Sequence, residues 1–458
     1  MQYSLADNNN TIIALSTPNG SGAIAMIRLS GENAITLTDD LFKGKLLRKQ
    51  PSHTLHYGRI VDGEETIDEV VIGLYKGPNS YTKQDVVEIS CHGSDYIVQR
   101  ILDLCIKHGA RLAMPGEFTM RAFLNGGLDL SQAEAVGDLI AATSAAEHKM
   151  ALNQLRGNYS NQIAELRQKL IDFASLVELE LDFGEEDVEF ADRKQLFDLV
   201  SGLLNRIESL IKSFRYGNAL KKGVPTVIAG RPNAGKSTLL NALLGENRAI
   251  VSDIAGTTRD TIEENLVIEG INFRLIDTAG IRDANDKIEA IGIERTFEKI
   301  KQSSIIVYLF DAKQLNEEEL RHDIQHLAAE KADLVIIANK VDIASNYEHL
   351  ADTYDNILFI SAKNETNISL LKRHLVETVK AWKVPNQSMV VNNMRHVQAF
   401  SQTAQALKAV QSGLTNHISG DFLAQDIREA LHHLGSITGE ISTDDLLGNI
   451  FSNFCIGK

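Results

Sequence analysis

Few cysteines, few prolines and no long apolar run limit the kind of protein that this chain can be. Its 458 residues include three cysteines, seven prolines and one tryptophan. Cys91, Cys105 and Cys455 are scattered and odd in number, which argues against a zinc site or a disulfide framework and favours a reducing cytoplasm. The chain also lacks an N-terminal apolar leader and any run of about 18 apolar residues, so we expect neither export nor a membrane span.

Basic residues are outnumbered by acidic ones, 46 to 61. A formal net charge of −15 opposes binding to a polyanion, because nucleic-acid affinity depends largely on neutralising phosphates. The short basic patches, within residues 43–49 and at Lys221 and Lys222, are more typical of solvated loops than of nucleic-acid contacts. With 43% hydrophobic residues the chain can form large cores, and its length suggests about three domains.

Residues Gly230–Ser237 have the sequence of a P-loop, Gly-Arg-Pro-Asn-Ala-Gly-Lys-Ser. The segment follows an apolar β-type run, Val224–Ala229, and precedes an apolar helical stretch, Leu239–Leu244, which is the strand-to-helix turn that a P-loop needs. Backbone N–H groups there can surround phosphates, Lys236 can reach the β and γ oxygens, and the Ser237 hydroxyl can ligate Mg²⁺. We therefore predict phosphate contacts at Asn233, Ala234, Gly235, Lys236, Ser237 and Thr238.

A guanine site is predicted further along the chain. The apolar run Leu334–Ala338 ends in an Asn-Lys-x-Asp motif, at the carboxyl end of a sheet strand, where open α/β folds bind ligands. The Asp342 carboxylate can accept from N1–H and N2–H₂ of guanine, whereas adenine offers no such donor pair. The next expected strand, 357–360, delivers a loop whose backbone can donate to guanine O6. The predicted base contacts are Asn339, Lys340, Asp342, Ser361, Ala362 and Lys363.

Two motifs between the P-loop and the guanine site complete the pattern of a GTP and GDP site. Asp277 ends the expected strand Phe273–Ile276 and can hold Mg²⁺ through a water, with the N–H of Gly280 near the γ-phosphate. Nucleotide contacts are accordingly predicted at Thr257, Thr258, Asp277, Thr278, Ala279 and Gly280. Thr258 is also expected, with Ser237, to be a metal ligand.

The spacing at which apolar residues recur changes along the chain. Short β-type runs mixed with helical ones predict an N-terminal α+β domain, long helical periodicity follows, and an α/β pattern begins near residue 218. Ser131 with Glu134 has the pattern of a helix capping box. The expected fold is multidomain, α+β and α/β, with a Ras-like P-loop GTPase domain inserted into a helical domain. The predicted segments are 1–122 (α+β), 123–217 (helical, first part), 218–382 (GTPase) and 383–458 (helical, second part).

Over essentially its whole length the chain resembles the MnmE (TrmE) family of tRNA modification GTPases. The resemblance rests on the P-loop with its asparagine, on the expected insertion, and on the segments 115–118, 121–125, 256–260, 277–280 and the terminal Phe-Cys-Ile-Gly-Lys. It implies a homodimer formed through the N-terminal domain, which binds 5-formyl- or 5,10-methylene-tetrahydrofolate. It also implies a heterotetramer with the flavin-dependent partner MnmG (GidA).

The reaction implied by the resemblance is the addition of an aminomethyl or carboxymethylaminomethyl group to C5 of the wobble uridine of certain tRNAs. A partner that carries much of the tRNA surface would reconcile this substrate with the acidic charge of the chain. The main alternative is a ribosome-assembly GTPase that modifies nothing. Such proteins typically carry tandem GTPase domains or a basic RNA-binding module, whereas this chain has one P-loop and no basic module. A folate-binding sensor without its own role in transfer also remains open.

Carried over from the family, the folate site would consist of Arg28, Glu88 and the terminal Lys458, with Cys455 nearby. Arginine and lysine suit folate because its glutamyl tail is anionic. From their pattern alone, Arg28 and Glu88 would be surface residues flanking strands, and an isolated cysteine would be inert packing. The chain departs from the family at Gly127, where a basic residue is common, and at Ser94, where a second glycine is usual.

The residue that activates water must differ from that of Ras-type enzymes, because Ile281 stands where they place a glutamine. The resemblance implies that Glu289 orients the water; a solvated helix carboxylate is the other interpretation of this residue. It further implies a K⁺ ion in place of an arginine finger, completed when two GTPase domains meet face to face. The implied K⁺ site draws on Asn233, Ser252, Ile254, Thr257 and Thr258.

Overall fold

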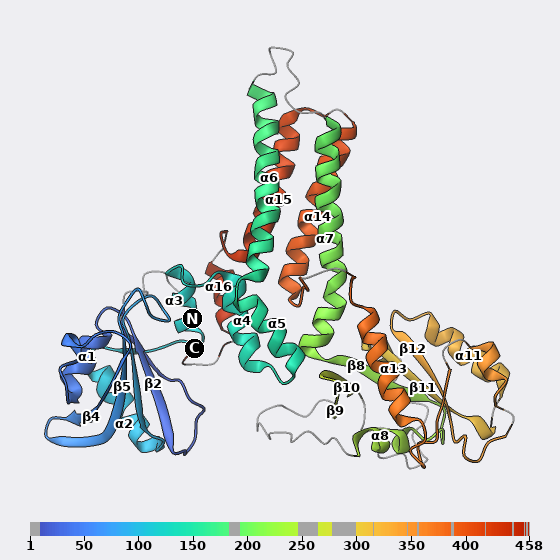
Figure 1. Ribbon diagram of the computed structural model, residues 1–458, viewed down its shortest axis with the longest axis horizontal. Coiled ribbons are helices and arrows are strands. Elements are labelled where there is room, and N and C mark those ends of the chain that lie inside the picture. Colours follow the sequence, from blue (N-terminus) through green and yellow to red (C-terminus); the bar gives the residue numbers. More distant parts are fainter. Residues whose placement is uncertain are drawn as a thin grey trace. The chain divides into compact units, whose positions relative to one another are not determined.

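The computed structural model divides the chain into two compact units (Figure 1). One unit comprises Met1–Ala141, Met150–Leu204 and Gln402–Lys458, and the other Ala142–Lys149 and Asn205–Ser401. The structure describes residues 10–182, 193–245, 264–276 and 299–458, except 315, 346, 355–356, 386–388, 417, 442–443, 453, 455–456 and 458. The four predicted domain segments stay a prediction, because the boundaries of the two compact units do not coincide with them.

A seven-stranded sheet begins the first unit, in the order β3-β4-β5-β6-β2-β1-β7. Its neighbours run antiparallel except for the parallel pair β1 and β7. Apolar residues of α1 and α2 pack on one face of this sheet, which confirms an α+β fold for this part. The elements are β1 Ile12–Leu15, β2 Ile24–Ser30, α1 Ala34–Leu41, β3 Phe42–Lys43, a 3₁₀ turn Leu47–Lys49, β4 Thr54–Asp62, β5 Glu65–Tyr75, β6 Val86–His92, α2 Asp95–Lys107 and β7 Arg111–Leu112.

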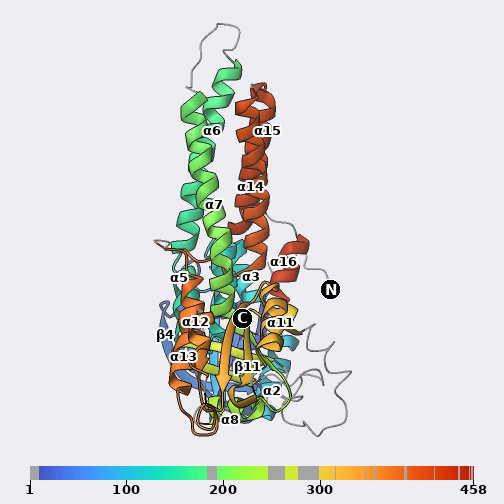
Figure 2. The same ribbon diagram turned by 90° about the vertical axis from the view of Figure 1, so that its right-hand side faces the viewer.

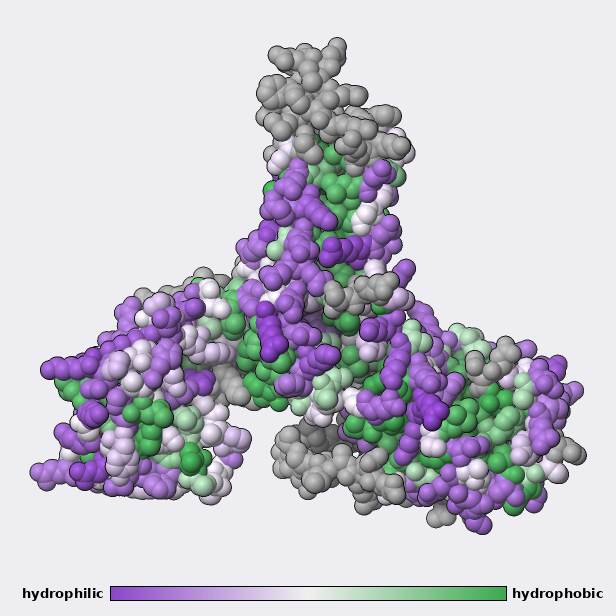
Figure 3. Space-filling model, in the orientation of Figure 1, coloured by the Kyte–Doolittle hydropathy of each residue, from purple (hydrophilic) through white to green (hydrophobic). Residues whose placement is uncertain are grey.

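Helices make up the rest of the first unit, and three of them, α5, α7 and α14, lie partly in the second. Figures 1 and 2 show α6, α7, α14 and α15 side by side, and Figure 3 shows hydrophilic side chains on the visible face of these helices with apolar ones between them. Within the described ranges, no helix has the length and apolar content that crossing a bilayer requires. The helices are α3 Glu117–Leu124, α4 Leu130–Ala141, α5 Ala145–Leu155, α6 Asn158–Asp182, α7 Arg193–Lys222, α14 Met394–Thr415, α15 Gly420–Thr438 and α16 Asp444–Phe451.

The capping box of α4 differs from the predicted one. Its N-cap is Asp129, whose Oδ1 accepts from the backbone N–H of Gln132 at 2.8 Å, while Gln132 Oε1 accepts from the Asp129 N–H at 2.9 Å. Ser131 instead donates its hydroxyl to Asp129 Oδ1 at 2.9 Å. The prediction of a capping box at Ser131 and Glu134 was wrong. The sequence also allows a box at Asp129 and Gln132, and a helix that starts there at Leu130 buries the Leu130 side chain fully.

The second unit contains a six-stranded sheet in the order β13-β12-β11-β8-β10-β9, parallel except for β9. Helices α8 and α13 share a core with one face, and α11 and α12 with the other, so the strands are near-continuous apolar runs. Because β8 lies between β10 and β11, the order reverses beside its carboxyl end, where α/β sheets bind ligands. The elements are β8 Val224–Gly230, α8 Lys236–Leu244, β9 Glu264–Ile268, β10 Ile271–Ile276, β11 Ile305–Asp311, a 3₁₀ turn Ala312–Gln314, α11 Glu317–Ala328, β12 Asp333–Asn339, α12 Leu350–Thr353, β13 Ile357–Phe359 and α13 Ile368–Ala381.

The chain enters and leaves this α/β part at one place. Helix α7 continues to Lys222, past residue 218, where the α/β pattern was expected to begin. The Arg215 guanidinium lies 4.1 Å from the centre of the Trp382 ring, at the end of α13, and both side chains bond to Asp333. Close by, the backbone N–H of Val391 donates to the Ser213 hydroxyl at 3.1 Å. The two connections therefore run side by side within the second unit.

A glycine inside α7 permits this approach. A Cβ at Gly217 would lie 2.1 Å from the Val391 carbonyl oxygen, whereas a Cβ at Gly202, in the same helix, would meet nothing within 4 Å. We expect Gly217→Ala to lower the free energy of unfolding by about 1–3 kcal/mol through overpacking. Gly202→Ala, the matched control, should raise it by up to about 1 kcal/mol because alanine favours helix. Thermal unfolding of both variants measures the difference, and equal effects would contradict the close approach.

Candidate functional site

The loop from β8 to α8 begins and ends at glycines that other residues cannot replace without strain. Gly230 has φ 152°, and a Cβ there would lie 2.0 Å from the Leu309 carbonyl oxygen. Gly235 has φ 98°, and its Cβ would lie 2.4 Å from Nδ2 of Asn339. Both positions combine a left-handed backbone with a close neighbour, so the two glycines of the motif are required by the fold of the loop.

A β-turn forms the middle of this loop. The Ala234 N–H donates to the Arg231 carbonyl at 3.3 Å, with Pro232 and Asn233 at the two central positions. Asn233 has φ 60°, which fits the third position of a type II turn, where asparagine is tolerated, and proline suits the position before it. The turn therefore presents Asn233, which is exposed, at its tip.

The first turn of α8 follows directly and carries the predicted phosphate-binding residues. Lys236 is the first residue of the helix, and its ammonium donates to the carbonyls of Gly230 at 2.7 Å and Arg231 at 3.0 Å. Ser237 and Thr238 are exposed in the same turn. Because the first N–H groups of a helix have no intrahelical acceptor, this loop is suited to binding an anion.

Asn339, at the end of β12, joins the loop to a second segment. Its Nδ2 donates to the Ala234 carbonyl at 2.8 Å, and its Oδ1 accepts from the Ala362 N–H at 2.9 Å. The side chain is almost fully buried, at 2% exposure. Two of the three predicted groups of site residues are thus connected by one amide.

Lys340 adds a further connection. Its ammonium donates to the Asn233 carbonyl at 2.7 Å and to Asp311 Oδ2 at 2.7 Å. Asp311 is not among the predicted site residues, although an acidic residue that ends the buried apolar run of β11 is a signal that could have identified it. The ammonium therefore holds the tip of the P-loop turn against the end of the neighbouring strand.

The remaining predicted base contacts lie beside this junction. Ser361 and Ala362 are buried after β13, and Ser361 forms an isolated β-bridge with Thr366. Asp342 and Lys363 are exposed. The carboxyl ends of β8, β12 and β13 thus bring the P-loop, the Asn-Lys-x-Asp segment and residues 361–363 to one edge of the sheet.

Several predicted site residues lie outside the described part of the chain. These are Ser252, Ile254, Thr257, Thr258, Asp277, Thr278, Ala279, Gly280, Glu289, Cys455 and Lys458.

In the first unit, the structure brings Arg28 and Glu88 together as direct cross-strand neighbours on β2 and β6. Glu88 Oε1 accepts from Nη2 of Arg28 at 2.8 Å and from Nε at 2.9 Å. The guanidinium also lies 5.5 Å from the ring centre of Tyr81 and 5.7 Å from that of Phe118. Both side chains are 21% exposed and stand within the sheet, so the interpretation as residues flanking strands is wrong.

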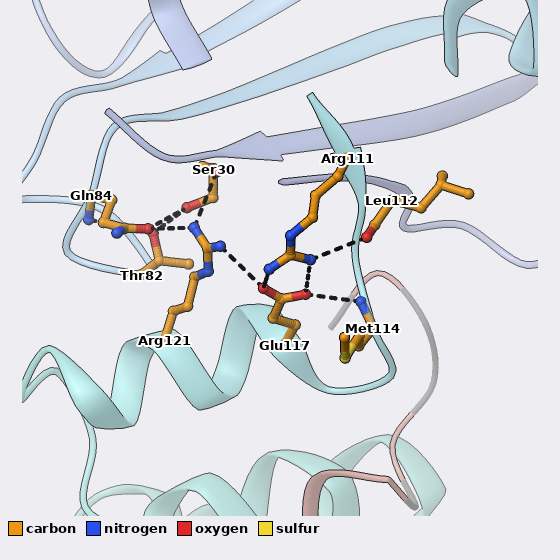
Figure 4. A network of polar contacts seen from close by, with 8 residues as sticks. All are labelled: Ser30, Thr82, Gln84, Arg111, Leu112, Met114, Glu117 and Arg121. Carbon is orange, nitrogen blue, oxygen red and sulfur yellow. Dashed lines mark hydrogen bonds and ion pairs between the residues drawn. The ribbon is translucent and has the colours of Figure 1, made fainter. Parts of the chain in front are cut away.

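A buried polar network holds the helix that carries Phe118 (Figure 4). Glu117 Oε1 accepts from Arg121 at 3.0 Å and from Arg111 at 2.6 Å, and the Arg121 side chain is fully buried. Burial would raise the pKa of Glu117, but bonds from Arg111, the Met114 N–H and Arg121 outweigh it and lower that pKa. Charged residues four apart in an otherwise apolar helix were the available signal for this network.

The end of the chain returns to the same sheet. The Gly457 carbonyl accepts from the Ser16 hydroxyl at 3.1 Å, and a Cβ at Gly457 would lie 2.2 Å from the Leu15 carbonyl oxygen. The residue before Lys458 therefore lies at the end of β1, next to β2. A Cβ at Gly127 would lie 3.1 Å from Lys83 Cε, so the stem of a basic residue already occupies the space beside that glycine.

The sheet order, the glycine-rich turn and the joined loops define a P-loop GTP-binding protein with an inserted α/β domain. Two family models match this chain, the MnmE helical domain over residues 130–455 and the GTP-binding protein TrmE N-terminus over residues 11–127. The chain belongs to the MnmE (TrmE) family of tRNA modification GTPases.

Full-length relatives support this membership. Proteins described as tRNA modification GTPase MnmE are 53% identical in Cytophaga hutchinsonii, with 99% of each chain covered, and 52% identical in Christiangramia forsetii, with 98% of this chain and 99% of the relative covered. The protein of that description from Bacteroides thetaiotaomicron is 49% identical, over 98% of this chain and all of the relative.

The Asn339 amide gives a direct test of the joined loops. We expect Asn339→Ala to lower the free energy of unfolding by about 2 kcal/mol or more, because it removes two buried hydrogen bonds and leaves the Ala234 carbonyl and the Ala362 N–H without them. Asn364→Ala, an exposed asparagine in the 361–366 loop, is the matched control and should change stability by less than about 0.5 kcal/mol. Denaturant titration of both variants measures the difference, and indistinguishable midpoints would refute the role of the amide.

Proposed function

We propose that this chain, a GTPase by family membership, couples GTP hydrolysis to modification of tRNA at C5 of the wobble uridine. The group added would be an aminomethyl or carboxymethylaminomethyl group, and the reaction would need a flavoprotein partner. The observation that supports the GTPase part most directly is the junction at Asn339, which joins the P-loop to the loop of residues 361–363. The proposed phosphate site and the proposed base site would thereby be held at a fixed spacing.

Each part of GTP has residues suited to it in this proposal. The α8 N-terminus and Lys236 would hold the phosphates, and the exposed Ser237 hydroxyl would be a ligand of Mg²⁺, with Thr258 and Asp277 completing that site. Asp342, exposed beside the buried Ser361 and Ala362, would accept from the guanine edge. The ligand atoms of the Ser237, Thr258 and Asp277 side chains are all oxygens, which Mg²⁺ prefers.

Hydrolysis in this proposal depends on a K⁺ ion and on Glu289. K⁺ would supply positive charge beside the bond that breaks, as an arginine finger does elsewhere. Asn233 fits the role of a K⁺ ligand because it is exposed at the tip of the turn, while its carbonyl is held by Lys340. The other proposed ligands are Ser252, Ile254, Thr257 and Thr258, and the proposed site is complete when two GTPase domains meet.

A tetrahydrofolate carrying a formyl or methylene group is the proposed one-carbon donor, with Arg28, Glu88 and Lys458 as its contacts. The Arg28 guanidinium, paired with Glu88 and lying over the rings of Tyr81 and Phe118, suits a planar, polar ring system with an anionic tail. Because Gly457 lies against β1, the terminal lysine can share this site. When bound, the folate would supply the carbon that becomes the methylene of the modification.

The proposed partners come from the family resemblance, and the charge of the chain is consistent with them. A net charge of −15 makes strong tRNA binding by this chain alone unfavourable, so a flavin-dependent partner of the MnmG (GidA) type would carry most of the tRNA surface. The proposed assembly is a heterotetramer built on a homodimer of this chain, acting in the cytoplasm.

Mass spectrometry of tRNA nucleosides tests the modification. A strain that lacks this chain should lose the C5 group from wobble uridines, and expression of the intact chain should restore it. Asp342→Asn in the rescue chain should fail to restore it at normal GTP levels, because the new amide would face the guanine amine with a donor. Unchanged wobble uridines in the deletion strain would instead favour a ribosome-assembly role.

Cation dependence tests the hydrolysis mechanism. We expect single-turnover GTP hydrolysis to be faster in KCl than in NaCl, by about 10³-fold or more if K⁺ fully replaces an arginine finger. Asn233→Ala should remove this dependence, whereas Glu289→Ala should slow hydrolysis in both salts and spare GDP affinity. Arg321→Ala, at an exposed arginine of α11 outside the predicted site, is the control. Equal rates in the two salts for the parent chain would overturn the K⁺ proposal.

A further inference from the structure

Arg231, the first residue of the P-loop turn, is tied to the helix α11 on the other face of the sheet. Its Nε donates to Asp323 Oδ2 at 2.8 Å and its Nη2 to Asp323 Oδ1 at 3.2 Å, a two-pronged pair. Its Nη1 also bonds to Glu319, one turn earlier on α11. A guanidinium that meets one carboxylate with two N–H groups and another with a third is fixed in direction as well as position.

Tyr308 on β11 orients the acceptor. Its hydroxyl donates to Asp323 Oδ2 at 2.6 Å, so both oxygens of this carboxylate are occupied. Burial would raise the pKa of Asp323, but hydrogen bonds from Arg231 and Tyr308 outweigh it and lower that pKa. The carboxylate is therefore an ionised, oriented partner for Arg231 and not a chance surface contact.

The main chain of Arg231 takes part in the P-loop itself. Its carbonyl accepts from the Ala234 N–H, which closes the turn, and from the Lys236 ammonium at 3.0 Å. The other end of the turn is held at Asn233 by Lys340. The turn is consequently fixed from two directions, by α11 at its first residue and by the end of β12 at its tip.

We infer that Arg231 is a positioning residue for GTP hydrolysis, held by Asp323 and Glu319 of α11. The link sets where the turn presents Asn233 relative to the phosphates, without contacting the nucleotide. A displacement of about 1 Å in such a group can cost on the order of 10²-fold in rate. Phosphate affinity should suffer less, because the N–H groups of α8 and Lys236 remain. The inference rests on the proposed GTP site.

The test compares hydrolysis of bound GTP with GDP affinity in the full chain. Arg231→Ala and Asp323→Asn should each slow single-turnover hydrolysis about tenfold, with GDP affinity changed less than about threefold. Arg231→Lys should recover part of the rate, since a lysine can pair with one carboxylate but cannot form the fork. The exposed Arg321→Ala, on the same helix, is the matched control and should leave both quantities unchanged.

A double variant decides whether the residues act through one link. If they do, Arg231→Ala with Asp323→Asn should be no slower than either single variant. Multiplied losses, or a rate for Arg231→Ala within about twofold of the parent, would overturn the inference. Asp323→Asn keeps the side-chain volume and so tests the link if Arg231→Ala does not fold. Failure of the GTP site itself would appear separately, as absence of GDP binding by the parent chain.

Discussion

The junction between the P-loop and the loop after β13 depends on one buried amide, that of Asn339. It bonds to the Ala234 carbonyl on one side and the Ala362 N–H on the other, so the P-loop and the loop after β13 cannot move apart without leaving buried polar groups unsatisfied. The left-handed Gly235 is required by the same contact, because a side chain there would collide with the amide. The spacing between the P-loop and the loop after β13 is thereby built into the fold.

A second set of contacts lies at the opposite end of the strand that carries Asn339. Arg215, Trp382 and Asp333 hold the incoming α7 beside the end of α13, and Asp333 is the first residue of β12, whose last residue is Asn339. Strand β12 therefore contacts α7 and the end of α13 through its first residue, and joins the P-loop to the loop after β13 through its last.

In the N-terminal part of the chain, ion pairs between side chains hold the residues beside the sheet in place. Arg28 and Glu88 are paired across adjacent strands, with the Arg28 guanidinium over the ring of Phe118, and the helix of Phe118 is fixed by the buried Glu117 and Arg121 together with the half-buried Arg111. A buried carboxylate with two guanidinium partners remains charged, which gives a fixed and specific placement of the aromatic ring. The return of the chain end to β1, through Gly457 and Ser16, adds a contact that spans nearly the whole sequence.

The sequence by itself determined the local features: the P-loop glycines, the apolar strands that end at Asn339, and the long helices. These follow from backbone conformation and from the period of apolar residues, which neighbouring positions decide. Only the tertiary structure decided which distant groups meet, such as Arg28 with Glu88, Arg231 with Asp323 and Lys340 with Asp311. Only in the folded structure is it also decided that Asp129, and not Ser131, is the N-cap of α4. A pairing between distant residues leaves no trace in local pattern, because its free energy arises only when the sheets and helices have packed.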